Sequence, residues 1–74
     1  MAGKAIHTVT GKTGWRNERE GAKRALSTHG TKAEAVRAGR EQARRDEVEH
    51  IIHNKDGSIG QRNSYGSDPR RRKG

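Results

Sequence analysis

The chain has 74 residues, of which 17 are Lys or Arg and 9 are Asp or Glu, so its formal net charge at pH 7 is +8. A chain of this length forms one small domain, and its lack of cysteine excludes disulfides and thiolate metal sites. No segment is typical of a signal peptide or approaches the roughly 20 apolar residues that span a bilayer. We therefore expect a cytoplasmic protein, as the missing cysteines also suggest, with no membrane partner.

Large aliphatic residues are scarce in this chain. Leu, Ile, Val and Phe together number eight, and so few of them with a high net charge are typical of disordered chains. These residues nevertheless fall in patterned segments between recognisable turns, which favours a folded domain with a thin core. The predicted core residues are Ile6, Val9, Trp15, Leu26, Val36, Val48, Ile51, Ile52 and Ile59.

The first half of the chain predicts a β-hairpin. Residues 5–10 are rich in β-branched side chains and are expected to form a strand, and residues 11–14 form a glycine-bounded turn. Residues 15–20 return as a second strand, with Trp15, Asn17 and Arg19 on one face. Residues 24–28 are a candidate third strand that carries Leu26 inward.

The second half predicts a helix followed by another hairpin. Thr31 and Glu34 have the spacing of a capping box, so a helix is expected to run from there to about residue 45. Residues 48–53 are the most strand-like segment of the chain, Asp56-Gly57 is a hairpin turn, and residues 58–61 form the last strand. The predicted fold is α+β, with a small antiparallel sheet in the order β-β-(β)-α-β-β covered by one helix. A single domain is expected over residues 1–62 and a flexible basic tail over residues 63–74.

Positive charge is distributed unevenly along the sequence. Residues 1–30 and residues 58–74 each carry a net charge of +4, whereas residues 31–57 are neutral overall. Such charge attracts polyanions, although it also serves solubility, and cations on an edge strand protect it against aggregation. The candidate nucleic-acid-binding residues are Lys12, Arg16, Arg19, Lys23 and Arg24, together with Arg70, Arg71, Arg72 and Lys73 of the tail.

Nothing in the sequence indicates catalysis, a metal site or a cofactor. His50 and His53 fall on opposite faces of one predicted strand, so they cannot share a metal ion there. The glycines at positions 11, 14 and 21 lack the strand and helix context of a phosphate-binding loop. Trp15 is more readily interpreted as core than as a base-stacking platform, because the chain has one Trp, one Tyr and no Phe.

Seven short motifs occur in an order that resembles the small bacterial family DUF2188. They are Gly14-Trp15, Arg19-Glu20-Gly21, Arg24 to Ser27, Thr31 to Ala35, Ile51 to His53, Asp56 to Ile59, and Ser64 to Pro69. The resemblance implies a fold shared with that family and no particular activity. Members resembling this chain usually have valine where Asn17 stands, and their tails are richer in proline and less basic.

The sequence thus predicts a non-enzymatic accessory protein that binds nucleic acid without sequence preference. DNA and RNA are equally acceptable partners, because counterion release from phosphates does not depend on sequence. The alternative is a protein-interaction or self-association module. Its partner is then a second copy that completes the thin core, or an acidic protein.

Overall fold

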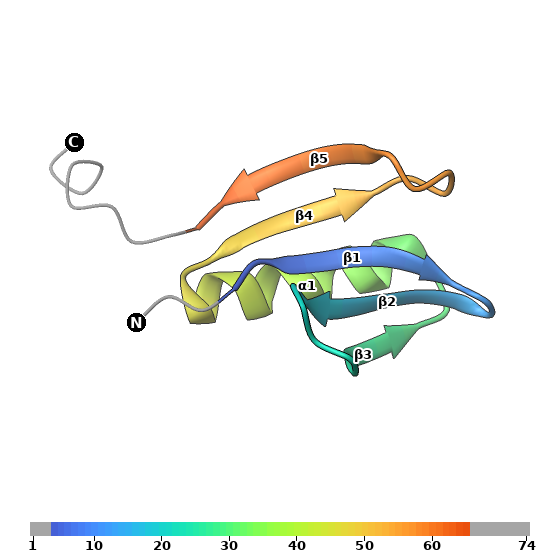
Figure 1. Ribbon diagram of the computed structural model, residues 1–74, viewed down its shortest axis with the longest axis horizontal. Coiled ribbons are helices and arrows are strands. Elements are labelled where there is room, and N and C mark those ends of the chain that lie inside the picture. Colours follow the sequence, from blue (N-terminus) through green and yellow to red (C-terminus); the bar gives the residue numbers. More distant parts are fainter. Residues whose placement is uncertain (1–3, 66–74) are drawn as a thin grey trace, which may run out of the picture.

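The computed structural model describes residues 4–65 of the chain. Its elements are the strands β1 (Ile6–Gly11), β2 (Gly14–Arg19) and β3 (Ala25–His29), the helix α1 (Lys32–Asp46), and the strands β4 (Glu49–His53) and β5 (Ile59–Ser64). The strands form one sheet in the order β3-β2-β1-β4-β5, and α1 lies across one of its faces (Figure 1). The predicted α+β class and the third strand are confirmed.

The sheet is mixed, which corrects the expectation of a purely antiparallel sheet. β1 pairs with β4 in parallel, whereas the β1–β2, β2–β3 and β4–β5 pairs are antiparallel. The helix carries the chain back along the sheet after β3, so that β4 runs in the same direction as β3 and β1. Parallel neighbours need such a long crossover connection, and the residues of a strand do not reveal the direction of its neighbour.

The last strand is longer than the sequence indicated. β5 continues to Ser64, beyond the predicted strand end at residue 61 and the predicted domain end at residue 62. Its pairing with β4 reaches Glu49 opposite Ser64, and the Tyr65 N–H then donates to the Val48 carbonyl oxygen at 3.3 Å. These backbone bonds hold a polar segment in the sheet without apolar side chains. The tail residues 66–74, including Arg70 to Lys73, lie outside the described residues.

Local signals set both ends of the helix. The Thr31 hydroxyl accepts a hydrogen bond from the Glu34 N–H at 3.2 Å, which confirms the predicted N-cap. The chain leaves the helix at Glu47, whose left-handed backbone (φ 60°) lets its N–H donate to the carbonyls of Ala43 and Arg44. The helix therefore ends where β4 has to begin.

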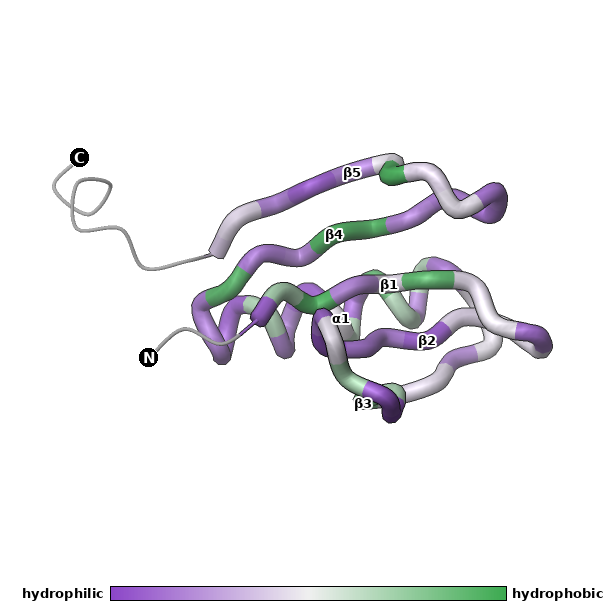
Figure 2. The backbone as a smooth tube through the Cα atoms, in the orientation of Figure 1, coloured by the Kyte–Doolittle hydropathy of each residue, from purple (hydrophilic) through white to green (hydrophobic). Residues whose placement is uncertain are grey.

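The core is thin, as predicted, and it lies mainly between the sheet and α1, with Ile51 buried on the other face of the sheet beside His7. The buried apolar residues are Ile6, Trp15, Ala35, Ala43, Val48, Ile51 and Ile52. Figure 2 shows how few apolar positions the backbone carries outside β1 and β4. The predicted burial of Leu26 and Ile59 is wrong, since they are 44% and 50% exposed. Both lie on edge strands, and within residues 4–65 the helix packs on β1 to β4 but does not contact β5.

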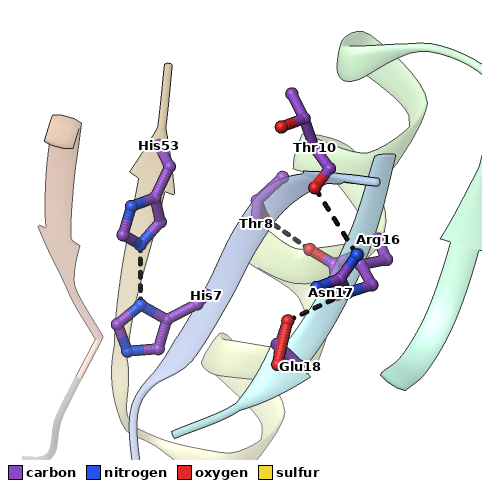
Figure 3. A network of polar contacts seen from close by, with 7 residues as sticks. All are labelled: His7, Thr8, Thr10, Arg16, Asn17, Glu18 and His53. Carbon is purple, nitrogen blue, oxygen red and sulfur yellow. Dashed lines mark hydrogen bonds and ion pairs between the residues drawn. The ribbon is translucent and has the colours of Figure 1, made fainter. Parts of the chain in front are cut away.

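Three polar side chains fill the centre of the interface between sheet and helix. Thr8, Asn17 and His50 are each at most 1% exposed. The Thr8 hydroxyl lies 2.5 Å from Asn17 Oδ1 and 2.6 Å from His50 Nε2 (Figure 3 shows the first contact). The hydroxyl has a single hydrogen, which it donates to the Asn17 oxygen. His50 Nε2 must therefore carry a hydrogen and donate it to Thr8.

The rest of this buried polar cluster ties the sheet to the helix. Asn17 Nδ2 donates to the Ala35 carbonyl at 2.9 Å and to the Ser27 hydroxyl at 3.3 Å. His50 Nδ1 is buried with no hydrogen-bond partner among the described residues. Burial lowers the pKa of His50 to about 4, and the positive charges of Arg40 and His7 act in the same direction. His50 is therefore neutral inside the fold.

Candidate nucleic-acid interface

The predicted cations around β2 do not form one patch. Lys12 lies in the turn that precedes β2, whereas Lys23 and Arg24 lie in the connection that follows it. At about 3.3 Å per residue, the strand separates these groups by roughly 17 Å. Each end of β2 therefore has to be considered as a separate candidate contact.

Arg19 has a structural role at the far end of β2. Its Nη2 donates to Asp46 Oδ2 at 2.7 Å, and its Nη1 donates to the Lys4 carbonyl at 3.3 Å. The hydrogen bond from Arg19, followed by one from Gln42, holds the pKa of Asp46 below its usual value. The pair joins the last turn of α1 to the sheet. The Arg19 guanidinium is thus engaged by two groups of the protein itself.

Arg16 lies on the open face of the sheet, away from the helix, as its alternation with Trp15 predicted. Its Nε is 2.9 Å from Glu18 Oε2, and its Nη1 is 3.5 Å from the Thr10 carbonyl oxygen (Figure 3). Glu18 partly neutralises the charge, and the ion pair is half-exposed, so its contribution to stability is small. The side chain remains within reach of a ligand at the near end of β2.

Two adjoining hollows lie at that near end, where the β1–β2 turn meets the start of the helix. They measure about 340 and 450 Å³ and share the residues around Trp15. Apart from threonines and glycines, they are lined by Lys12, Trp15, Arg16, His29 and Lys55. None of the lining residues is acidic. We call this region the turn-end hollow.

Two neighbouring groups complete the charge around the turn-end hollow. Lys32 Nζ lies 5.4 Å from the Trp15 ring centroid, a cation–π distance. Asp56, next to Lys55 in the chain, directs Oδ1 to the Ser58 N–H at 2.9 Å and to the Ser58 hydroxyl at 2.7 Å. The hydrogen bonds from Ser58 lower the pKa of Asp56, so this carboxylate is engaged within its own turn. Asp56 therefore stays ionised outside the lining and offsets part of the Lys55 charge, whereas the lining itself carries only cations.

Gly14 allows two strands to approach each other closely at the base of the turn-end hollow. Gly14 has φ +144°, and a Cβ at this position would collide with the carbonyl oxygen of His29. Only glycine allows the start of β2 to approach the end of β3 this closely. Trp15, which follows it, is 9% exposed, so the indole is a core residue with little surface in the hollow.

Lys32 and Lys55 were missed by the sequence reasoning, which placed them in a neutral stretch. The β1–β2 and β4–β5 turns lie at the same end of the sheet because β1 and β4 are parallel, and α1, which runs in the opposite direction, begins there too. To identify Lys32 and Lys55 from the sequence, one would have had to know that β1 and β4 are parallel, which the sequence did not reveal. Lys23 and Arg24 are exposed at the opposite end.

The described part of the chain has neither a metal-binding cluster nor a membrane-spanning helix. Among residues 4–65, no group of three or more His, Asp or Glu side chains is arranged to hold a metal ion. His50 and His53 do point to opposite faces of the sheet, as predicted. The one helix in the described range is too short and too polar to cross a membrane.

The comparisons with known proteins agree with the resemblance noted in the sequence. The chain is 37% identical over 67 residues to "Uncharacterized protein YdaT" of Bacillus subtilis (strain 168), which covers 90% of this chain and 45% of that protein. It therefore spans less than half the length of this relative, and no solved structure matches it significantly. A sequence model described as "Uncharacterized protein conserved in bacteria (DUF2188)" matches residues 6–65, so the chain belongs to the DUF2188 family.

Proposed function

We propose that the protein binds nucleic acid without sequence preference, in the cytoplasm, by contacting phosphates at the turn-end hollow. The observation that supports this proposal is that Lys12, Arg16 and Lys55 line two adjoining hollows with no acid in their lining, while Lys32 lies against the neighbouring Trp15 ring. These cations come from different segments of the chain, and the fold brings them to one end. The basic tail supplies a second set of phosphate contacts.

The aromatic residues favour contact with phosphates over contact with bases. Sheets that read single strands present exposed aromatic rings on which bases stack. Here Trp15 is buried in the core, and Tyr65 packs beside Ile6, Ala43 and Val48. Affinity is then expected to come mainly from counterion release, which makes DNA and RNA comparable ligands and makes binding depend strongly on salt.

The first test is the affinity of the full-length chain for duplex DNA, single-stranded DNA and RNA by fluorescence anisotropy. We expect micromolar binding that weakens at least about tenfold between roughly 50 and 200 mM salt. An affinity that does not change with salt concentration, or no binding at low salt, would contradict the proposal. In the second case the charge serves solubility, and a protein partner becomes the better hypothesis.

Two charge-matched double variants locate the interface on the folded body. Lys12→Gln with Lys55→Gln removes two cations from the turn-end hollow, and Lys23→Gln with Arg24→Gln removes two from the opposite end. We expect the first pair to lower the slope of log K against log salt by about 2, since each phosphate contact contributes about 0.9. The second pair should change it by less than about half of that. An equal decrease of the slope in both double variants would show that binding depends on the total charge and not on its position.

The tail is tested separately by replacing Arg70, Arg71, Arg72 and Lys73 with glutamine. A loss of affinity that adds to the effect of the turn-end variant supports two independent contacts. Unchanged affinity would remove the tail from the proposal and leave the turn-end hollow as the interface.

Self-association is the second candidate, and one observation favours it. The edge strand β5 has no helix beneath it, and its Ile59 is half-exposed. A second copy could pair with this edge. Sedimentation over a hundredfold range of concentration tests the idea, and a strict monomer throughout would reject it.

A further inference from the structure

Two histidines face each other on the open side of the sheet. His7 of β1 and His53 of β4 bring Nδ1 and Nε2, respectively, to 2.8 Å, with ring centroids 5.1 Å apart and planes tilted by 32° (Figure 3). A distance of 2.8 Å between two ring nitrogens is that of a hydrogen bond, so one of them carries the hydrogen and the other accepts it. Both rings are removed from the helix and from the turn-end hollow.

The outer nitrogens of the two rings also have partners. His7 Nε2 lies 3.2 Å from Glu20 Oε1, and His53 Nδ1 lies 3.4 Å from the Gly57 carbonyl oxygen. A carboxylate oxygen and a carbonyl oxygen only accept hydrogen bonds. To make these two contacts, each outer nitrogen has to carry a hydrogen.

The number of hydrogens in this chain of contacts is therefore fixed. Three contacts need three N–H groups, while two neutral imidazoles supply two. One additional proton supplies the third N–H group. A fourth hydrogen would place N–H groups on both His7 Nδ1 and His53 Nε2, which are only 2.8 Å apart. We propose that His7 and His53 form a single-proton site, in which the folded pair takes up one proton and excludes a second. This inference goes beyond nucleic-acid binding and does not depend on it.

The charged groups around the pair are compatible with one positive charge. On this face, Glu18 lies opposite His7 in β2 and is paired with Arg16, and Glu20 contacts His7 directly. Arg62 of β5 lies opposite Ile51, which is itself opposite His7, so Arg62 is in the same row as His7. Arg19 lines the same hollow as the pair. A hollow of about 250 Å³ lined by both histidines leaves the site open to protons from solvent.

His50 is the remaining histidine of β4, on the opposite face of the sheet. Burial, and to a smaller extent the charges of Arg40 and His7, lower the pKa of His50, so the core histidine is neutral on the face opposite the pair. The bound proton would connect three segments of the chain, because His53 touches both β1 and the turn that carries Lys55. The site thus acts as a proton-dependent clasp between β1 and the β4–β5 turn.

Long-range ¹H–¹⁵N correlation spectra of the histidine rings, recorded on the full-length chain at about pH 5, test this inference. At this pH ordinary histidines, with a reference pKa near 6.5, carry two N–H groups each. We expect three protonated nitrogens and one unprotonated nitrogen across His7 and His53, because the pair shares one charge. Two doubly protonated rings in a folded chain, or two neutral rings, would overturn the proposal.

A matched variant separates a shared proton from two rings that are simply close. In His53→Gln the His7 ring has no imidazole partner, and it should carry two N–H groups at about pH 5, as an ordinary histidine does. The backbone amide signals of Gly57 and Ser58 should move together with the His7 ring signals in the wild type, whereas in His7→Gln they should follow the His53 ring alone and over a different pH range. Amide signals that move identically in His7→Gln would contradict the clasp.

Discussion

Replacing Gly39 with alanine should destabilise the fold by about 2–4 kcal/mol, because the methyl group overpacks the buried polar cluster. A Cβ at this position would lie 2.5 Å from Asn17 Oδ1, 2.6 Å from His50 Nε2 and 2.9 Å from Thr8 Oγ1. The opposite is expected from helix propensity alone, which favours alanine over glycine by about 1 kcal/mol. A decrease in the free energy of unfolding would therefore show that the buried polar cluster fills the space next to Gly39, and an increase would show that this space is free.

Urea denaturation of the two proteins measures this difference. The free energy of unfolding should fall in Gly39→Ala with little change in the slope against urea, since the surface exposed on unfolding is unchanged. Gly30→Ala is the control, because a Cβ at that position meets nothing within 4 Å. A Gly39→Ala protein that is as stable as the wild type would show that the three polar side chains leave room for a methyl group.

Acid should weaken the fold through His50. Its pKa is about 4 in the folded chain and about 6.5 as an ordinary histidine. Between these values the unfolded chain binds a proton that the folded chain excludes, so the free energy of unfolding falls as the pH falls from about 6.5 to about 4. The stabilisation is complete above this window, and its loss across the window is about 3 kcal/mol.

Urea titrations at several pH values within that window give the dependence directly. His50→Gln removes the titrating group while its amide can still donate to the Thr8 hydroxyl. This variant should be less stable at pH 7 and should lose most of the dependence on pH. Within this window the His7–His53 pair acts in the same direction, because the folded pair excludes the second proton that the unfolded chain binds, so the comparison is best made in a His53→Gln background. An unaltered dependence in His50→Gln would assign the acid sensitivity to other groups.

Local features of the fold were predictable from the sequence. The Thr31 cap, the alternation of Trp15 and Arg16 across β2, and the turn at Asp56 each depend on residues that are near one another in the chain. The structure confirms all three. The face on which Asn17 lies was also predicted, since alternation along a strand does not depend on the rest of the fold.

What the sequence could not provide were contacts between distant segments. Thr8 contacts Asn17 and His50, and the three residues come from three different strands, so the buried polar cluster required the strand order. Leu26 and Ile59 seemed to be core residues because apolar character reveals neither an edge strand nor the reach of a helix. For the same reason Lys12 and Arg16 were identified as candidates, whereas Lys32 and Lys55 were not.

Because α1 does not pack beneath β5, the side of the turn-end hollow next to this strand is easier to displace than its other sides. β5 is held by its pairing with β4 alone, so it should open at a smaller free-energy cost than strands packed on both the sheet and α1. Lys55 is carried by the turn that leads into this strand, whereas Lys32 belongs to the helix and Lys12 to the hairpin of a central strand. We therefore expect the hollow to adjust its width on one side, which the proposed binding of both duplex and single-stranded nucleic acid would require.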